Sequence, residues 1–361
     1  MKKNLIINLE IIRFLAAINI VTGHYGHFYE FFNLSKETLP YYEKIQTPYA
    51  GSSVFIFFLM SGAIFFHNYE DKIKSNKIKL YDFIKKRFAR LAPLHWITLF
   101  FSFLLQLIII FQIDKYFIYN NNNTKEFLIH FFFLYGVLSN TGGSFNSPSW
   151  SISTEMLMYF LFFLMVKMNF FLNTSVIFKY IFIIIFLFFL MKVFSFTFIH
   201  LLKTQTFIIE YNLVLKSFFA FNVGCLIYCL SMKIKENKRK FNRFAYLIIT
   251  IFLIMILDKF FSEAIPNGSI PVIILFFAIY FDFTFKKMNF LLNYLGNISY
   301  SIYLIHFPVQ LILIIVNYNF ILLNFETISV FWIYIFLTIT LGSLSYYFFE
   351  SPIKRKILNK F

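Results

Sequence analysis

The sequence predicts an all-α fold, a polytopic bundle of about ten membrane-spanning helices. Of the 361 residues, 59% are hydrophobic, and the mean hydropathy is +0.71. The apolar residues also gather in runs long enough to cross a bilayer, for which a helix needs about 20 residues. A soluble domain of this size does not carry so many such runs. We therefore expect a single membrane domain over residues 1–361.

Ten apolar stretches are candidate membrane-spanning helices. They are residues 8–28, 50–67, 91–112, 151–167, 177–192, 213–231, 244–259, 269–283, 295–316 and 328–349. Several are short and must tilt or thin the bilayer locally. A further apolar piece, residues 126–139, is too short for a span and is typical of an interfacial or re-entrant segment. The first stretch holds Arg13 and lacks a small-residue cleavage site, so we expect a retained helix rather than a signal peptide.

Basic residues gather in the short loops between these stretches, most densely in residues 71–90 and 232–243. Loops rich in lysine and arginine stay on the cytoplasmic side of a membrane. An even number of crossings must then separate the two loops, which holds if residues 126–139 do not cross. This count places both termini in the cytoplasm. The net charge of +16 follows from the same rule, and no stacking motif or basic helix indicates nucleic-acid binding.

Arg13 and His24 are the most informative pair in the first stretch, LEIIRFLAAINIVTGHYGHF. Eleven residues make about three helical turns, which puts the two side chains on nearly the same face, roughly 16 Å apart along the axis. Charged and titratable groups at membrane depth are expensive and face a bundle interior or a wet cavity. One helix thus presents a permanent cation near one membrane surface. It also presents a possible proton acceptor, either deeper in the bilayer or near the opposite surface.

Small residues mark the two ends of GSSVFIFFLMSG, residues 51–62, which begins the second stretch. They allow the close approach of either a neighbouring helix or a ligand, and helix packing is the favoured interpretation. Cys225 and Cys229 lie four residues apart on one predicted helix. We expect them to be inert packing residues rather than a disulfide or a metal site.

Arg87 and Arg90 are three residues apart in YDFIKKRFARLAPLHW, residues 81–96, and face the same way on a helix. One interpretation is a phosphate clamp, because guanidinium groups bind phosphates in bidentate geometry. The other is an ordinary cytoplasmic basic cluster, followed by Pro93 and Trp96 at the entry to the next membrane helix. The local pattern alone favours the basic cluster.

Glu155, in NSPSWSISTEMLMYF, lies about one turn inside an apolar span, and Ser149 or Ser151 is placed to cap that helix. A carboxylate there is costly unless it is paired or hydrated. A functional role is therefore favoured: Glu155 pairs with Arg13 or a lysine, or it orients a histidine.

In the later stretch LGNISYSIYLIHFPVQL, His306 is either a second titratable group or a structural histidine.

Taken together, these motifs closely resemble the acyltransferase 3 family of integral membrane acyltransferases, over essentially the whole chain. The matching residues are Arg13 and His24; Gly51, Phe57, Phe58, Ser61 and Gly62; Arg87 and Arg90; Trp150, Ser151, Glu155 and Tyr159; Leu295, Gly296, Ser299, Tyr300, Tyr303 and His306; and Glu350, Pro352 and Arg355. Ser52 and Ser53 stand where the family usually carries a glycine or an acidic residue, so we carry no role onto them. Any one motif is weak, but six in the right order make the resemblance strong.

The resemblance implies a donor, acetyl-CoA or another acyl-CoA, bound from the cytoplasm. It also implies that the acceptor is a hydroxyl group of a cell-envelope saccharide or lipid-linked glycan. The implied location is the bacterial cytoplasmic membrane, where the protein contacts membrane lipids. A thioester is already an activated acyl donor, so we expect no metal. Some relatives carry a soluble SGNH esterase-like domain after the membrane part. Only about ten residues follow the last predicted helix here, so we expect no such domain.

The resemblance also assigns roles to residues. The implied catalytic residues are His24, Glu155 and Arg13: His24 as a base or a covalent acyl carrier, Glu155 orienting His24 or binding sugar hydroxyls, and Arg13 holding the donor or offsetting developing charge. The implied donor-binding residues are Arg87, Arg90 and Arg13. The implied substrate-binding residues are Trp150, Tyr300, His306 and Ser61.

Two other functions compete with acyl transfer. A proton-coupled transporter or flippase of a glycan precursor would use Arg13, Glu155 and His24 as a proton or substrate pathway. A simple permease does not need the paired Arg87 and Arg90, and the sequence lacks repeated halves. A lipid-saccharide polymerase usually needs a large outer loop, which the predicted topology does not provide. Acyl transfer is therefore the favoured function.

Overall fold

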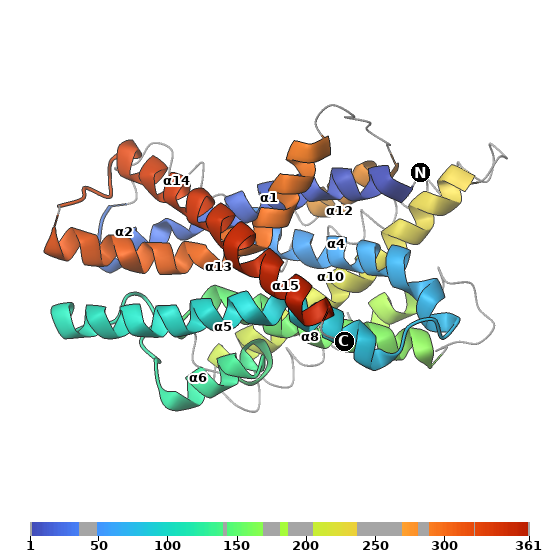
Figure 1. Cartoon of the computed structure of the whole chain (residues 1–361), viewed down its shortest axis with the longest axis horizontal. Coiled ribbons are helices and arrows are strands. Elements are labelled where there is room, and N and C mark those ends of the chain that lie inside the picture. The colour runs from blue at the N-terminus through green and yellow to red at the C-terminus, as the bar shows by residue number, and fades with distance from the viewer. Residues whose placement is uncertain are drawn as a thin grey trace. The chain divides into compact units, whose positions relative to one another are not determined.

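The computed structural model describes residues 2–35, 49–139, 143–168, 181–186, 205–236, 269–280, 289–320 and 322–359. Within these ranges the chain is helical apart from turns and short loops, and they contain no strand, which confirms the all-α class (Figure 1). The α-helices are α1 (Lys2–His24), α2 (Gly26–Phe32), α4 (Tyr49–Lys74), α5 (Leu80–Ile113), α6 (Thr124–Phe131), α7 (Tyr135–Leu138), α8 (Trp150–Lys167), α10 (Gln205–Glu236), α12 (Ser269–Tyr280), α13 (Asn289–Asn319), α14 (Ile328–Ser345) and α15 (Ser351–Asn359). A 3₁₀ turn, η2 (Ser147–Ser149), precedes α8, and a π-helical turn, η3 (Tyr346–Glu350), joins α14 to α15.

Five helical stretches in the described part of the chain are long and apolar enough to cross a membrane. They are Leu80–Ile113, Ser147–Lys167, Leu213–Lys235, Phe290–Asn319 and Ile328–Asn359. Each overlaps a predicted span, and the protein is therefore a multi-pass membrane protein. Residues 126–139 fall in α6 and α7, both far shorter than a span, as predicted. The spans predicted at 177–192 and 244–259 lie wholly or largely outside the described residues, so the total of ten and the position of the termini stay predictions.

The helix α5 begins at Leu80, well before the membrane entry that the sequence marks at Pro93 and Trp96. The basic segment is therefore continuous with the apolar part of the helix, and Pro93 lies inside it. Proline removes one backbone hydrogen bond, a loss that neighbouring helices make tolerable in membrane proteins. Next to this proline, α13 contacts the α5 backbone: the hydroxyl of Tyr300 donates a 2.7 Å hydrogen bond to the carbonyl of Leu91.

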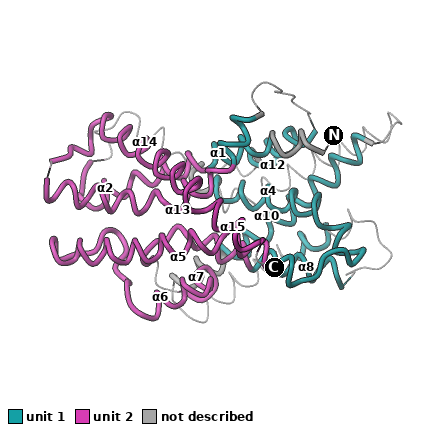
Figure 2. Tube along the Cα trace, viewed as in Figure 1, with its two compact units in different colours: residues 1–16, 51–83, 157–296 teal, residues 17–50, 84–156, 297–361 magenta. Residues whose placement is uncertain are grey.

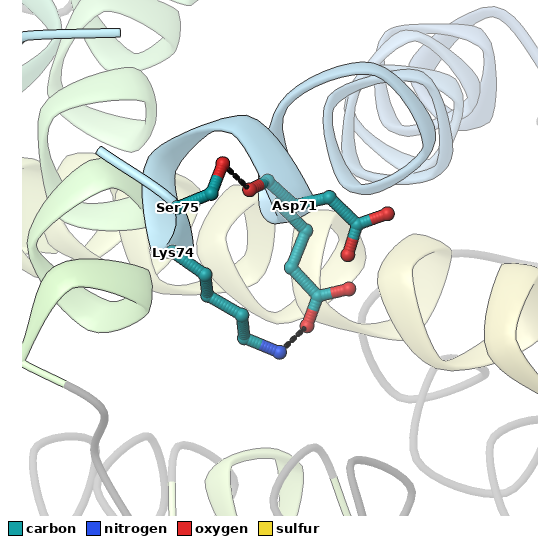
Figure 3. Close-up of polar contacts among 4 residues, drawn as sticks. Asp71, Lys74 and Ser75 are labelled. Atoms are coloured by element: carbon teal, nitrogen blue, oxygen red, sulfur yellow. Dashed lines mark hydrogen bonds and ion pairs between the residues drawn. The ribbon is translucent and has the colours of Figure 1, made fainter. Parts of the chain in front are cut away.

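A polar turn separates α4 from α5 (Figure 3). Near the end of α4, the ammonium of Lys74 pairs with Glu70 at 2.6 Å, and the Ser75 hydroxyl donates to the carbonyl of Asp71 at 2.6 Å. Asn76 then takes a left-handed conformation, with φ of 56°, which is a common way to end a helix.

The chain divides into two compact units (Figure 2). Unit 1 comprises residues 1–16, 51–83 and 157–296, and unit 2 comprises residues 17–50, 84–156 and 297–361. Each unit thus gathers three stretches that are far apart in the sequence.

In unit 1, α4 and α10 approach closely because each carries a glycine at the contact. A Cβ atom on Gly62 would lie 1.9 Å from the carbonyl oxygen of Phe221, and one on Gly224 would lie 2.0 Å from that of Leu59. The thiol of Cys225 donates to the carbonyl of Gly62 at 3.3 Å. The helix-packing interpretation is thus confirmed for Gly62. Cys225 and its neighbour Cys229 are buried free thiols, as predicted.

In unit 2, the end of α1 and the short α2 pack against the start of α14 and the loop before it. The ring of Phe28 stacks on Phe325 with centres 4.4 Å apart. The buried hydroxyl of Tyr25 donates to the carbonyl of Phe325 at 2.8 Å, and that of Tyr334 donates to the carbonyl of Val21 at 3.2 Å. Buried phenol groups find such partners because an unpaired hydroxyl in an apolar interior is costly. These contacts fix the backbone around His24.

Candidate active site

His24 lies at a break between two helices. It is the last residue of α1, and α2 begins at Gly26. Carbonyl groups at the end of a helix lack their intrahelical partners. That of His24 instead accepts a 2.5 Å hydrogen bond from the side-chain amide of Gln310, on α13. The break therefore presents the His24 side chain from a backbone that a neighbouring helix holds in place.

The ring of His24 is hydrogen-bonded to His306. Nδ1 of His24 lies 2.7 Å from Nε2 of His306. The ring planes differ by 13° and the ring centres are 4.9 Å apart, which fits an in-plane hydrogen bond between ring edges. His306 is fully buried, whereas His24 is half-buried. The structure thus brings together two predicted site residues that are 282 positions apart in the sequence.

His27 and Gln310 complete this cluster, and the sequence analysis missed both. Nδ1 of His27 lies 3.0 Å from Oε1 of Gln310, and the rings of His24 and His27 are stacked with centres 4.9 Å apart. Gln310 follows His306 by four residues, which places both on one face of α13. The available signal was the presence of polar side chains three or four positions from each predicted histidine, in otherwise apolar runs.

The turn that leads into α8 is tied to the same helix, α13. The side-chain amide of Asn146 donates to the carbonyl of Leu304 at 3.1 Å. The hydroxyl of Tyr303 donates to the carbonyl of Pro148, and the Ser151 hydroxyl lies 2.8 Å from the same phenol oxygen. Two motifs identified in the sequence, around residues 150 and 303, therefore meet in unit 2.

Glu155, Trp150 and Tyr300 also belong to unit 2. Glu155 and Trp150 are half-buried on α8. Tyr300 is buried, with its hydroxyl bonded to the backbone of α5. The ring of His24 contacts His306 in this arrangement, and the role suggested for Glu155 in orienting a histidine stays a prediction.

Arg13 and Ser61 belong to unit 1. The Arg13 guanidinium pairs with Glu10, one turn earlier on α1, at 2.8 Å. Gly296 makes room for that carboxylate, since a Cβ atom there would lie 1.9 Å from Oε2 of Glu10. Glu10 is thus one partner of Arg13, and the pairing of Arg13 with Glu155 that the sequence suggested stays a prediction. Ser61 is half-buried on α4.

Arg87 and Arg90 take part in a basic cluster around a buried carboxylate, Glu350. The Ser301 hydroxyl donates to Oε2 of Glu350 at 2.6 Å, and Glu350 is only 4% exposed. The charges of Arg90 and Lys354 act on Glu350, and those of both arginines act on Lys354. Two cations next to the carboxylate, with Arg87 beside Lys354, leave net positive charge, which suits an anionic ligand such as a phosphate.

A second pair of buried histidines lies at α6. His95 of α5 donates through Nε2 to the carbonyl of His130 at 2.9 Å. The ring of His130 contacts the hydroxyls of Ser149 and Ser144 at 3.2 and 3.0 Å. Burial, with a smaller contribution from His95, lowers the pKa of His130 well below its usual range, so the ring is neutral. These groups anchor α6 and the following turn.

The described residues contain no group of three or more His, Cys, Asp or Glu side chains placed to hold a metal ion.

Comparison with protein families gave one match, and it covers nearly the whole chain. Residues 6–347 match the family model Acyl_transf_3, described as an acyltransferase domain. The matched range includes five of the six motifs found in the sequence, and the closing motif follows it directly. Comparisons with curated proteins and with solved structures found no match.

Proposed function

Since the chain belongs to the acyltransferase 3 family, we propose that this membrane acyltransferase moves an acetyl group from acetyl-CoA to a hydroxyl of a cell-envelope saccharide or lipid-linked glycan. The proposed location is the bacterial cytoplasmic membrane. The observation that supports this chemistry best is the half-buried His24, whose ring is bonded on one side to buried His306. The second ring nitrogen is then available for a substrate.

The proposed reaction uses that second nitrogen, Nε2 of His24, as a general base. The acceptor hydroxyl gives its proton to Nε2 while its oxygen attacks the thioester carbonyl. The carbon–sulfur bond then breaks, and the CoA sulfur leaves with the proton returned from Nε2. The products are an acetyl ester and free CoA, so atoms and charges balance.

The basic cluster supports the choice of CoA as donor. CoA carries a pyrophosphate and a 3′-phosphate, and Arg87 and Arg90 are half-buried cations three residues apart on α5. Guanidinium groups bind phosphates through paired charge-assisted hydrogen bonds. Because α5 is helical through this segment, both side chains project from a rigid element. Arg13 is proposed to offset charge that develops on the thioester oxygen.

The start of α8 is the proposed contact for the acceptor. Glu155 and Trp150 are half-buried there, and a carboxylate with an aromatic ring suits a sugar, which presents hydroxyls along one edge and an apolar face. Ser61 is proposed to line the substrate path from α4. Tyr300, with its hydroxyl bonded to Leu91, is proposed to support the site through α5.

The test is a comparison of surface glycans from cells that lack the protein or express the wild type, His24→Ala or His67→Ala. His67 is a suitable control because its ring bonds to Tyr228 and it has no role in the proposed reaction. Proton NMR before and after mild base detects O-acetyl groups. We expect a base-labile acetyl signal with the wild type and His67→Ala but not with His24→Ala.

Two outcomes contradict this expectation in different ways. An undiminished signal from His24→Ala, at equal protein level in the membrane, would remove His24 from the chemistry. Absence of any acyl group from every strain would count against a glycan acceptor, and transport of radiolabelled glycan precursor by the same cells would then support the flippase.

A further inference from the structure

We propose that His306 is a positioning residue that fixes the proton on Nδ1 of His24 and so leaves Nε2 of His24 as the proton acceptor. This inference rests on the proposed acyl transfer and adds the group that makes His24 a base. It is carried by a continuous chain of hydrogen bonds in unit 2 that runs from the carbonyl of Tyr303, through the ring of His306, to the ring of His24.

The first step concerns the protonation of His306. Its Nδ1 atom lies 2.5 Å from the carbonyl oxygen of Tyr303, one turn earlier on α13. A carbonyl oxygen can only accept a hydrogen bond, so Nδ1 must carry a proton. His306 is fully buried, and a buried side chain without a paired opposite charge is neutral. A neutral imidazole has one N–H group, so Nε2 of His306 is an acceptor.

The second step transfers this constraint to His24. Because Nε2 of His306 accepts, Nδ1 of His24 must be the donor across the 2.7 Å contact. The near-coplanar rings fit such a bond. Neutral His24 with its proton on Nδ1 has an unprotonated Nε2. The nitrogen that makes no hydrogen bond to the described residues is thus the one able to accept a proton from a hydroxyl group.

The third step concerns the backbone, which Gln310 holds from the same face of α13. Its amide nitrogen donates to the carbonyl of His24, so its amide oxygen is the atom that faces Nδ1 of His27. His27 therefore also carries its proton on Nδ1. One helix face, with His306 and Gln310 a single turn apart, fixes both the main chain and the ring of His24.

This arrangement has a consequence during catalysis. When Nε2 of His24 takes the acceptor's proton, the ring becomes an imidazolium whose Nδ1–H still donates to His306. In hydrolytic triads a carboxylate orients the histidine in the same way and stabilises its positive charge. Here the orienting group is a neutral imidazole, and its contribution comes from geometry and the choice of tautomer.

The direct test measures the tautomer itself. Full-length protein with ¹⁵N-labelled histidine, held in lipid nanodiscs, gives nitrogen shifts that distinguish protonated from unprotonated ring atoms. The chain has seven histidines, and the His24 signals are those lost in His24→Gln. We expect a protonated Nδ1 and an unprotonated Nε2 for His24 in the wild type, and a mixture of both tautomers in His306→Leu. A wild-type His24 with its proton on Nε2 would overturn the proposal.

Kinetics provide the second test, with His306→Leu compared with His306→Gln. The glutamine carbonyl oxygen reaches about as far as Nε2 of histidine and keeps an acceptor, so we expect kcat close to the wild-type value. Leucine removes the acceptor, and we expect kcat to fall about 100-fold with little change in the KM for acetyl-CoA. His67→Leu is the matched control.

Each result decides a different question. Full activity of His306→Leu, or equal inactivation by glutamine and leucine in variants that elute as folded monodisperse protein, would contradict the positioning role. If the wild-type protein transferred no acyl group at all, the proposed function would fail. The nitrogen shifts would still decide whether His306 sets the tautomer of His24.

Discussion

At the scale of single residues, the Glu10–Arg13 pair depends on a glycine far away in the sequence. A Cβ atom on Gly296 would lie 1.9 Å from the carboxylate oxygen of Glu10 and 2.4 Å from its Cβ. Both carboxylate and chain must therefore move in Gly296→Ala, and we expect a loss of about 1–3 kcal/mol in the free energy of unfolding. Thermal unfolding in detergent measures it. A Glu10→Ala background removes the carboxylate but keeps the Cβ atom, so it should relieve only the part of this loss that comes from the carboxylate. Strictly additive effects would show that the contact with the carboxylate does not matter.

The sequence identified single site residues better than it identified their partners. His24 and His306 stood out because each is a titratable group in an apolar run, but nothing local indicates that their rings touch across 282 positions. His27 was missed because a polar residue near the end of a predicted span is equally compatible with the membrane interface, and Gln310 because a single amide in an apolar run does not indicate a partner. Glu10, three residues before Arg13, was also missed as a partner, because in a sequence any carboxylate in the bundle is a possible partner for a buried arginine.

At the scale of elements, the short helix α6 is held at its C-terminal end by two neighbouring residues of α5. His95 donates to the carbonyl of His130, and Trp96 donates through Nε1 to that of Phe131 at 2.8 Å. The Trp96 ring also stacks on Phe131 with centres 5.0 Å apart. Both carbonyls belong to the last turn of the helix, where intrahelical partners run out. These two residues therefore act as a cap supplied by another helix.

Trp96→Phe should loosen this attachment, because phenylalanine keeps the aromatic contact but cannot donate a hydrogen bond. We expect a cost of about 1 kcal/mol, confined to α6 and the turn after it. Hydrogen–deuterium exchange of peptides covering residues 124–139 measures it, with faster exchange expected in the variant. Trp332→Phe is the control, since Trp332 is 60% exposed on α14. Equal exchange in wild type and Trp96→Phe would mean that the Trp96 hydrogen bond does not help to hold α6.

The elements show why apolar length predicts spans well and helix ends poorly. Residues 126–139 were excluded as a span by length alone, and α6 and α7 agree. The predicted span within α5 began at residue 91 because hydropathy detects only the apolar part of a helix. The first turns of α5 are charged, and they are helical from Leu80 onward with Ala89 and Leu91 on a buried face. Burial by tertiary packing is not visible in a hydropathy profile.

At the scale of the whole molecule, the topology follows from charge and from the count of crossings. Residues 71–90 and 232–243 are both strongly basic, and both are expected in the cytoplasm. The first of these ranges also holds Arg87 and Arg90, so this side is the one from which CoA is proposed to bind. The loop with Asn120–Asn123, which precedes α6, is then expected on the outer side.

Single cysteines introduced into these three regions test the topology. The native Cys225 and Cys229 are buried thiols, so background labelling should be low. We expect a membrane-impermeant maleimide to label Asn121→Cys in intact cells, and Ser75→Cys and Asn237→Cys only after permeabilisation. Labelling of Ser75→Cys in intact cells would invert the orientation and remove the proposed CoA site from the cytoplasm. Labelling of Asn237→Cys alone would make the number of crossings between the basic loops odd, and residues 126–139 would then have to be reconsidered as part of a span.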